Sequence, residues 1–324
     1  LAQKGDVFYQ TVRPYQMNNY LYDLPYDNYV FSTGYAQMRP NIDSYFLLNS
    51  VQNKQFVQHV LDRSTGTSYP AINSSDLSNI EIHVPSKLSE QQKIGAFFQS
   101  IDDTIALHQR KLDLLKEQKK GYLQKMFPKN GAKVPELRFA GFADDWEERK
   151  LGDVFSERSE RSSEGELISV TINSGVVKAS ELDRKDNSSN DKSNYKKVEV
   201  GDIAYNSMRM WQGASGYSSY DGILSPAYTV IIPKEGTDSK FFAYDFKRHD
   251  MIQTFKRNSQ GLTSDTWNLK FPTLKSVKVM VPCMEEQTKI SNFFERLDTT
   301  ITLHQRKLDL LKEQKKGFLQ KMFV

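Results

Sequence analysis

Residues 105–127 read IALHQRKLDLLKEQKKGYLQKMF, and residues 301–323 read ITLHQRKLDLLKEQKKGFLQKMF. The two stretches differ only at Ala106/Thr302 and Tyr122/Phe318, and a constant offset of 196 residues relates them. A repeat of this length, with a spacing as long as a domain, is typical of a chain built twice on one plan. We therefore expect two related halves, each ending in the same long element.

Each copy has the apolar pattern of a long helix that pairs with another helix. Apolar residues recur at alternating spacings of three and four, which is the a/d rhythm of a heptad. The pattern predicts helices over residues 89–128 and 283–324 that pack on each other. Heptads alone do not fix the direction, and an antiparallel coiled coil is favoured because it would place two domains at opposite ends. The predicted helix-pair core is Phe98, Ile101, Ile105, Leu112, Leu115, Phe294, Leu297, Ile301, Leu308 and Leu311.

Two polar residue types interrupt each apolar stripe. His108 and His304 occupy the same heptad position in the two copies, where we expect polar core residues that set the register. Metal binding is the less favoured interpretation, because no further ligands accompany them. Lys119 and Lys315 are expected to bury their stems and to extend their ammonium groups to solvent.

One glycine is repeated within each helix, at Gly121 and Gly317. A glycine inside a helix costs about 1 kcal/mol relative to alanine. Its repetition suggests the close approach of another backbone, such as a partner subunit, or alternatively a kink in each helix.

Shorter matches precede the helices. Residues 5–9 (GDVFY) correspond to residues 201–205 (GDIAY) at the same offset of 196. The alternating apolar runs at 80–84 and 277–281 are each followed by a proline and predict a strand before each helix. The halves are therefore expected to be α+β domains.

These matches set the expected domain boundaries. A first domain covers residues 1–88, a linker covers 129–134, and a second domain covers 135–282. The segment 135–196 has no counterpart ahead of residue 1, so we expect that the first domain lacks its N-terminal part.

Two polar stretches lie within the second domain. Residues 156–166 and 183–194 are rich in Ser, Arg, Glu, Asn and Lys. Such a composition buries little surface, so both stretches are predicted to be loops.

Composition indicates a soluble, intracellular protein, which we place in the cytoplasm. The chain has no apolar stretch long enough to cross a membrane and no visible signal peptide. The single cysteine, Cys283, excludes an intramolecular disulfide, and no Cys/His cluster has zinc spacing. A net charge of +4 permits a polyanionic partner without requiring one.

Catalytic motifs are missing from the sequence. There is no GxxxxGK[ST] loop for ATP. An adenine methyltransferase would need a glycine-rich cofactor loop and an [NDS]PP[YF] tetrapeptide; the nearest string is SPAY at 225–228, which we interpret as a turn leading into a strand. The chain is therefore predicted not to be an enzyme and to bind no cofactor or metal itself.

The order and spacing of these segments resemble the specificity subunit of type I restriction-modification systems. The resemblance rests on PELRFAGFADDWEERKLGDVF at 135–155, on residues 66–105 and on residues 281–323, and it covers essentially the whole chain. It implies two target-recognition domains that read the halves of a bipartite, asymmetric site in double-stranded DNA. The helices would act as a ruler between the half-sites.

The resemblance also implies partner subunits. Two methyltransferase subunits would be carried on the helices, and restriction/translocase subunits would join them. S-adenosylmethionine, ATP and Mg would be bound by these partners. The alternative is a non-catalytic DNA-binding scaffold, regulator or decoy that is unrelated to methylation.

Two polar segments in each domain are candidates for DNA contact, since Arg, Lys, Asn, Gln, Ser and Thr are the side chains that reach phosphates and base edges. The first segment can equally be a solvated hairpin tip with a packed aromatic residue, and the second a helix end followed by a glycine turn. The candidates in the first domain are Arg13, Tyr15, Gln16, Arg63, Thr67 and Ser68. Those in the second domain are Asn206, Arg209, Trp211, Gln212, Lys256, Arg257, Thr263 and Ser264.

Overall fold

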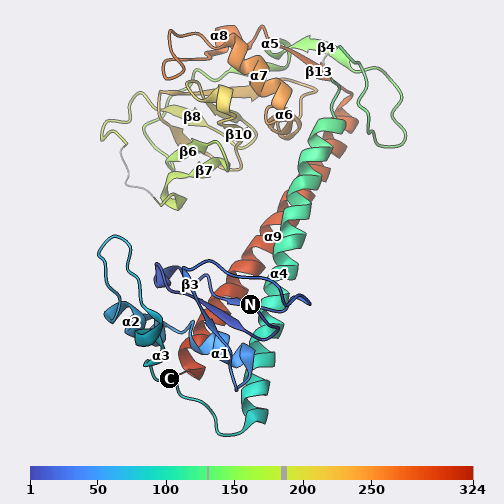
Figure 1. Cartoon of the computed structure of the whole chain (residues 1–324). Coiled ribbons are helices and arrows are strands. Elements are labelled where there is room, and N and C mark those ends of the chain that lie inside the picture. Colours follow the sequence, from blue (N-terminus) through green and yellow to red (C-terminus); the bar gives the residue numbers. More distant parts are fainter. Residues whose placement is uncertain (130, 184–187, 324) are drawn as a thin grey trace. The chain divides into compact units, whose positions relative to one another are not determined.

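The computed structural model describes residues 1–129, 131–183 and 188–323. The chain divides into two compact units. Unit 1 comprises Leu1–Leu114 with Ile301–Val324, and unit 2 comprises Leu115–Thr300. Each unit contains an α+β domain and one part of each long helix (Figure 1).

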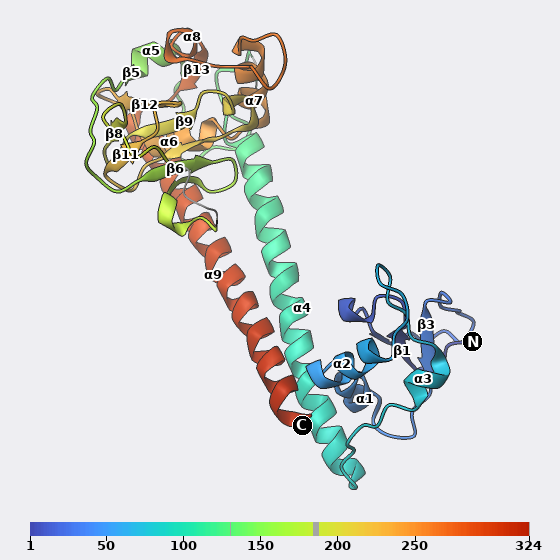
Figure 2. The same ribbon diagram turned by 90° about the vertical axis from the view of Figure 1, so that its left-hand side faces the viewer.

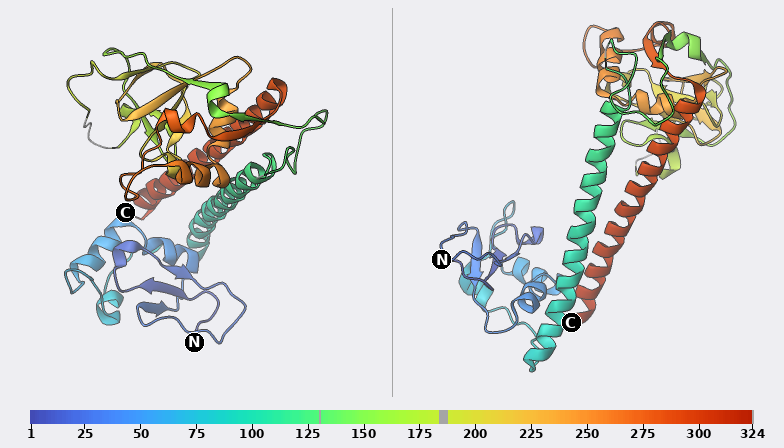
Figure 3. Two further views of the ribbon diagram at one scale, coloured as in Figure 1. Left: turned by 90° about the horizontal axis from the view of Figure 1, so that it is seen from above. Right: turned by 90° about the vertical axis from the view of Figure 1, so that its right-hand side faces the viewer.

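Unit 1 is built on a three-stranded antiparallel sheet of order β2-β1-β3, which Figure 3 shows in blue. Val7, Tyr9, Phe56 and Val60 form its core where the helices pack on the sheet. The elements are β1 (Val7–Gln10), the 3-10 helix η1 (Pro14–Gln16), β2 (Tyr20–Leu21), β3 (Tyr35–Met38), α1 (Ser44–Ser50), α2 (Lys54–Asp62), α3 (Ser74–Ser78) and the start of α4 (Leu88–Lys125).

Unit 2 repeats this plan and adds further strands. Its main sheet has four strands in the order β10-β9-β12-β5. Three separate two-stranded sheets, β11-β8, β13-β4 and β6-β7, accompany it. The N-terminal elements are β4 (Glu147–Lys150), α5 (Leu151–Val154), β5 (Phe155–Glu157), β6 (Ile168–Thr171), β7 (Gly175–Lys178), η2 (Ala179–Glu181) and β8 (Lys196–Val198). The others are β9 (Ile203–Asn206), η3 (Met210–Gln212), β10 (Ser215–Tyr217), β11 (Gly222–Leu224), β12 (Tyr228–Pro233), α6 (Ser239–Asp245), α7 (His249–Asn258), α8 (Phe271–Leu274), β13 (Lys278–Val281) and α9 (Met284–Met322).

The helices α4 and α9 pack antiparallel in both units (Figure 2). In unit 1, Asp102 pairs with Lys315 at 2.6 Å, and the Nδ1 atoms of His108 and His304 lie 3.3 Å apart. Partner numbers fall along α9 as they rise along α4, which fixes the direction. Because two unprotonated Nδ1 atoms would repel each other at this distance, one imidazole must donate to the other.

Unit 2 contains the repeat of the same contacts. Lys119 pairs with Asp298 at 2.5 Å, and Tyr122 meets Phe293 edge-on with ring centroids 5.0 Å apart. The expectation that Lys119 and Lys315 extend to solvent is therefore wrong. A carboxylate on the facing helix holds each ammonium group in the helix pair.

The predicted core positions are all at least half-buried, and Phe294 is buried in the domain core of unit 2 against Phe127 and Tyr244. Phe98, Leu112 and Leu115 on α4 are buried, as are Phe294, Leu308 and Leu311 on α9. Ile101, Ile105, Leu297 and Ile301 are half-buried.

A repeated glutamine ties each long helix to the domain before it. The Gln91 side chain accepts from Asp43 N and donates to Pro85 O, and the Gln287 side chain accepts from Asp238 N and donates to Pro282 O. Asp43 and Asp238 in turn cap α1 and α6. These bonds explain why short polar motifs were copied along with the apolar stripe.

A buried carboxylate is also repeated, but its arginine partner is not. Asp202 is 2 % exposed and accepts two hydrogen bonds, at 2.8 and 3.0 Å, from Arg158, which is 6 % exposed. Its counterpart Asp6 is 1 % exposed and pairs with Arg39, which is 54 % exposed. The hydrogen bonds from Arg39 are the main cause that lowers the pKa of Asp6 to about 2.

Arg158 corrects one expectation from the sequence. The prediction that residues 156–166 form a loop that buries little is wrong in part, because the stretch begins within β5 and contains a buried arginine. The physical reason is its ion pair with Asp202, a partner 44 residues away. Of the other predicted loop, 183–194, residues 184–187 lie outside the described residues.

The expectation of two strands before the helices is half wrong. Residues 278–281 form β13, which pairs antiparallel with β4. Residues 80–84 form no strand. Among the described residues, nothing in unit 1 corresponds to β4, so this alternating run has no partner strand, and Ile80 and Ile82 pack against the core.

Candidate nucleic-acid interface

In unit 2, the two polar segments singled out from the sequence lie side by side. The first connects β9 to β10 through η3, and the second follows α7. Leu269 N donates to Ser207 O at 2.8 Å, which joins the two segments through their backbones. The Trp211 and Trp267 rings meet edge-on with centroids 5.2 Å apart. Residues separated by more than fifty positions thus form one surface.

The second segment is a closed loop. The backbones of Gln260 and Asn268 exchange hydrogen bonds of 3.1 and 2.8 Å at its base. Thr266 Oγ1 accepts from Thr263 N and donates to Thr263 O. At Gly261 the φ angle is +155° and an added Cβ would lie 2.6 Å from Thr266 O, so the loop requires glycine there.

Two cations precede this loop, and one carboxylate, Asp265, lies exposed on it. Lys256 and Arg257 are exposed at the end of α7, and Lys256 Nζ lies 5.6 Å from the centroid of the Trp267 ring. Thr263 and Ser264 are exposed on the loop itself. The segment therefore offers positive charge and hydroxyl donors, which suit phosphate oxygens.

Unit 1 brings together the equivalent segments. Arg13 N donates to Pro70 O at 2.8 Å, and the Arg13 guanidinium lies 4.2 Å from the centroid of the Tyr69 ring. Thr65 and Ala71 exchange two backbone hydrogen bonds of 2.9 Å, which close the loop containing Thr67 and Ser68. The same framework in the two units thus presents different side chains.

Several candidates use their polar atoms within the protein. Asn206 Oδ1 accepts from Met208 N, and Trp211 Nε1 donates to Met208 O. Gln16 Oε1 accepts from Gln10 Nε2, and Arg63 Nη1 donates to His59 O. These contacts shape the two segments. Arg209 and Gln212 are half-buried beside them, whereas Tyr15 is exposed.

Three residues at these two separate surfaces, one in unit 1 and two in unit 2, are absent from the sequence-based candidates. Tyr69, Trp267 and Leu262 became visible only when the two segments were found together. The sequence did contain one signal, which is a large apolar or aromatic residue soon after the glycine of each loop. Tyr69 follows Gly66, and Leu262 follows Gly261.

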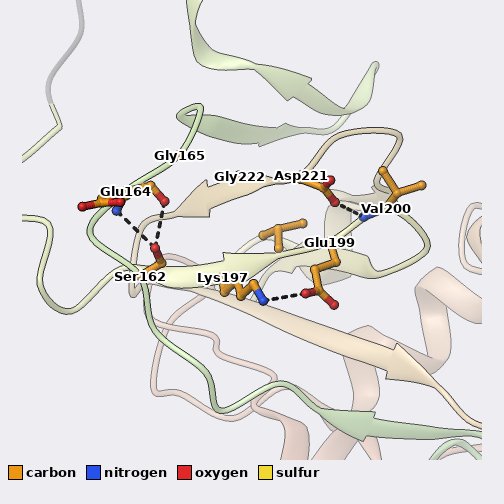
Figure 4. Close-up of a pocket in the computed structure, with 9 residues that line it drawn as sticks. Ser162, Glu164, Gly165, Lys197, Glu199, Val200, Asp221 and Gly222 are labelled. Atoms are coloured by element: carbon orange, nitrogen blue, oxygen red, sulfur yellow. Dashed lines mark hydrogen bonds and ion pairs between the residues drawn. The ribbon is translucent and has the colours of Figure 1, made fainter.

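A separate polar hollow of about 490 Å³ lies beside β8 and β11 in unit 2 (Figure 4). Three carboxylates line it, from Glu164, Glu199 and Asp221, against one ammonium group, from Lys197. Lys197 pairs with Glu199 at 2.6 Å, and Asp221 accepts from Val200 N. This excess of negative charge disfavours a phosphate backbone at the hollow, so the paired loops remain the candidate segments for DNA contact.

Neither a metal site nor a membrane span occurs in the part of the chain that the structure describes. No group of three or more His, Cys, Asp or Glu side chains there could hold a metal ion. None of the described helices is long and apolar enough to cross a membrane.

The chain thus has two α+β domains on one plan and an antiparallel pair of long helices. The polar loops of the two domains differ, which is typical of a protein that binds two different surfaces. The family model for the type I restriction modification DNA specificity domain matches residues 2–117 and 143–313. The chain therefore belongs to this family of DNA specificity subunits. Specificity subunits of the family are non-catalytic, and catalysis lies in their partner subunits.

Individual relatives agree with this assignment. The chain is 22% identical over 302 residues to the MjaVIII specificity subunit of Methanocaldococcus jannaschii, a match that covers 86% of this chain and 69% of that protein. It is 30% identical over 112 residues to the HindI specificity subunit of Haemophilus influenzae, covering 33% of this chain and 24% of that protein. The latter match thus spans about a quarter of the relative's length.

The fold is shared with solved specificity subunits. The S subunit of a type I restriction-modification system from M. genitalium superposes with a TM-score of 0.64 at 17% identity, covering 100% of this chain and 84% of that one. This confirms the predicted class of two α+β domains with two long helices.

Proposed function

We propose that this chain reads a bipartite, asymmetric site in double-stranded DNA on behalf of a type I restriction-modification complex. The observation that carries the proposal is the pair of converging polar loops found in each unit on a repeated framework. Identical readers would favour a palindromic target, whereas these readers differ.

The differences lie at the positions that would meet DNA. Unit 1 presents Arg13 stacked on Tyr69, while unit 2 presents Lys256 beside two tryptophans. Arginine pairs with guanine and with phosphate, and the other polar side chains reach phosphates and base edges. Each unit therefore reads its own half-site.

The long helices have a second, unused apolar surface. Leu107 and Leu114 on α4 are 65 % and 51 % exposed, and their repeats Leu303 and Leu310 on α9 are 58 % and 52 % exposed. Each pair is spaced by seven residues, which keeps both leucines on one face of the helix. Because about half of each side chain is already covered, covering the rest contributes about 1–2 kcal/mol to a complex.

Gly121 and Gly317 follow the leucines by a further seven residues in the sequence, and an added Cβ at either would meet no atom within 4 Å. The helices continue through both glycines, so neither marks the end of a helix. Two equal stripes of Leu, Leu and Gly support the binding of two copies of one partner, which we propose to be the methyltransferase subunit.

Chemistry is assigned to the partners. In this proposal S-adenosylmethionine is bound by the methyltransferase subunits, and ATP with Mg by restriction/translocase subunits that join the complex. We propose that the assembly is located in the cytoplasm, where its DNA target is found.

Methylation mapping tests the proposal. The chain is co-expressed with its methyltransferase subunit, and modified adenines are located by long-read sequencing across the host genome. We expect one split, asymmetric motif, and its absence when the methyltransferase is expressed alone. A palindromic motif would contradict two unlike readers, and no motif at all would contradict the specificity role.

A further inference from the structure

We infer that Leu262 is a wedge that enters the base stack of the half-site read by unit 2. The inference rests on the proposed DNA-reading function and adds a device to it. Leucine is among the apolar residues that partly unstack a base step and bend the duplex. Three features of the loop support this assignment.

The first feature is exposure. Leu262 is 101 % exposed, so its whole side chain lies in water on the closed loop. A fully exposed leucine gains nothing for the fold. The same side chain becomes useful once a partner surface covers it.

The second feature is rigidity. The backbone bonds between Gln260 and Asn268, the bonds between Thr263 and Thr266, and the close approach at Gly261 hold the loop from three directions. A wedge must keep its shape while bases separate around it. A flexible tip would instead fold its leucine back onto the protein.

The third feature is the surrounding charge. Lys256 and Arg257 lie exposed at the end of α7 just before the loop, and the hydroxyl groups of Thr263 and Ser264 follow the leucine directly. These groups suit the phosphates on either side of a base step. The two cations outnumber the one carboxylate of the loop, Asp265, and an apolar side chain in this setting fits a nucleic acid better than an apolar pocket of a protein.

The matching loop of unit 1 is built differently. Its large side chain is Tyr69, 61 % exposed, and the Arg13 guanidinium covers one face of the ring. The tyrosine is thus held at the surface as part of a platform. The wedge belongs to unit 2 alone.

The experiment uses the full chain with its methyltransferase and a duplex that carries the mapped target. 2-Aminopurine replaces one base at a time through the half-site of unit 2, because its fluorescence rises when it is unstacked. The adenine that is methylated is left unreplaced, because a methyltransferase flips that base out of the stack by itself. We expect a rise of several-fold at one step for the wild type. Leu262→Ala should lose that rise and bind the duplex roughly tenfold more weakly, while Leu262→Met should keep both.

Lys256→Ala is the matched control on the same loop base. It should weaken binding and reduce the salt dependence, yet keep the fluorescence rise at saturating protein. A wild type that binds the target over a scrambled duplex without any rise overturns the wedge and leaves the proposed function intact. The wedge is likewise overturned if Leu262→Ala keeps the rise, or if it disrupts methyltransferase assembly without DNA. A wild type that does not distinguish target from scrambled DNA overturns both.

Discussion

The repeated buried carboxylate allows a comparison within one molecule. Arg158→Met removes the buried partner of Asp202, and Arg39→Met removes the equivalent partner of Asp6. In unit 2 both charges are almost fully buried, with 2 % and 6 % of the side chains exposed. In unit 1 the carboxylate is buried at 1 % while its arginine is 54 % exposed.

These exposures set the expected magnitudes. Leaving a buried charge without its partner costs about 3–5 kcal/mol, so Arg158→Met should destabilise unit 2 by that amount. A pair that water reaches from one side contributes about 1 kcal/mol, so Arg39→Met should cost unit 1 about that much. Arg158→Lys keeps one charge-assisted bond in place of two and should fall between these limits.

Hydrogen exchange followed by mass spectrometry measures each unit separately. Peptides that contain β9 report on unit 2, and peptides that contain β1 report on unit 1. At about 1.4 kcal/mol per factor of ten, Arg158→Met should accelerate exchange in β9 by roughly a hundredfold to a few thousandfold and leave β1 unchanged. Arg39→Met should accelerate β1 by less than about tenfold. Equal effects in the two units, or a larger effect of Arg39→Met, would refute the argument from burial.

Three further predictions concern acid, the helix seam and the repeated glycines. Because its folded pKa is lowered to about 2, Asp6 contributes stability that is complete above about pH 4 and is lost as the pH falls toward 2, so the cost of Asp6→Asn in urea unfolding should vanish over that interval. Leu112→Ala and its repeat Leu308→Ala should each cost about 2–5 kcal/mol in denaturant unfolding, because both side chains are 1 % exposed in unit 1; clearly unequal costs would argue against equivalent packing. Gly121→Ala and Gly317→Ala should each stabilise the free chain by up to about 1 kcal/mol in thermal unfolding while weakening methyltransferase binding in titration calorimetry; unchanged binding would remove the glycines from the partner surface.

The long helices could be predicted from the sequence because heptads are a local signal and the repeat displayed it twice. No local feature of the sequence argued against the strand predicted at 80–84, which the structure does not contain. Its apolar alternation matches that of β13, and only the partner strand β4 decides between the two outcomes. Strands depend on distant backbone partners, whereas helices satisfy their own hydrogen bonds.

Burial of charge was equally hidden from the sequence. Arg158 stands in a run of polar residues, and its partner Asp202 belongs to the copied motif GDIAY. The candidate loops were recognised from their composition, but their convergence was not, because it depends on how η3 packs beside α7. The prediction that Lys119 and Lys315 extend to solvent was wrong for a related reason. Their carboxylate partners, Asp298 and Asp102, lie on the facing helix and are distant in the sequence.

The two ion pairs across the helix seam have a consequence for how such chains change over generations. Lys119 with Asp298 and Lys315 with Asp102 are the same contact made twice, and His108 meets its own repeat. The contacts across the seam are therefore the same whichever of the two domains precedes a given helix. An exchange confined to residues 128–282, which lie between the first repeat and α9, would replace the second domain and leave Lys119, Asp298, Lys315 and Asp102 in place. The proposed second reader could then be replaced as a unit while both ion pairs of the seam are inherited unchanged.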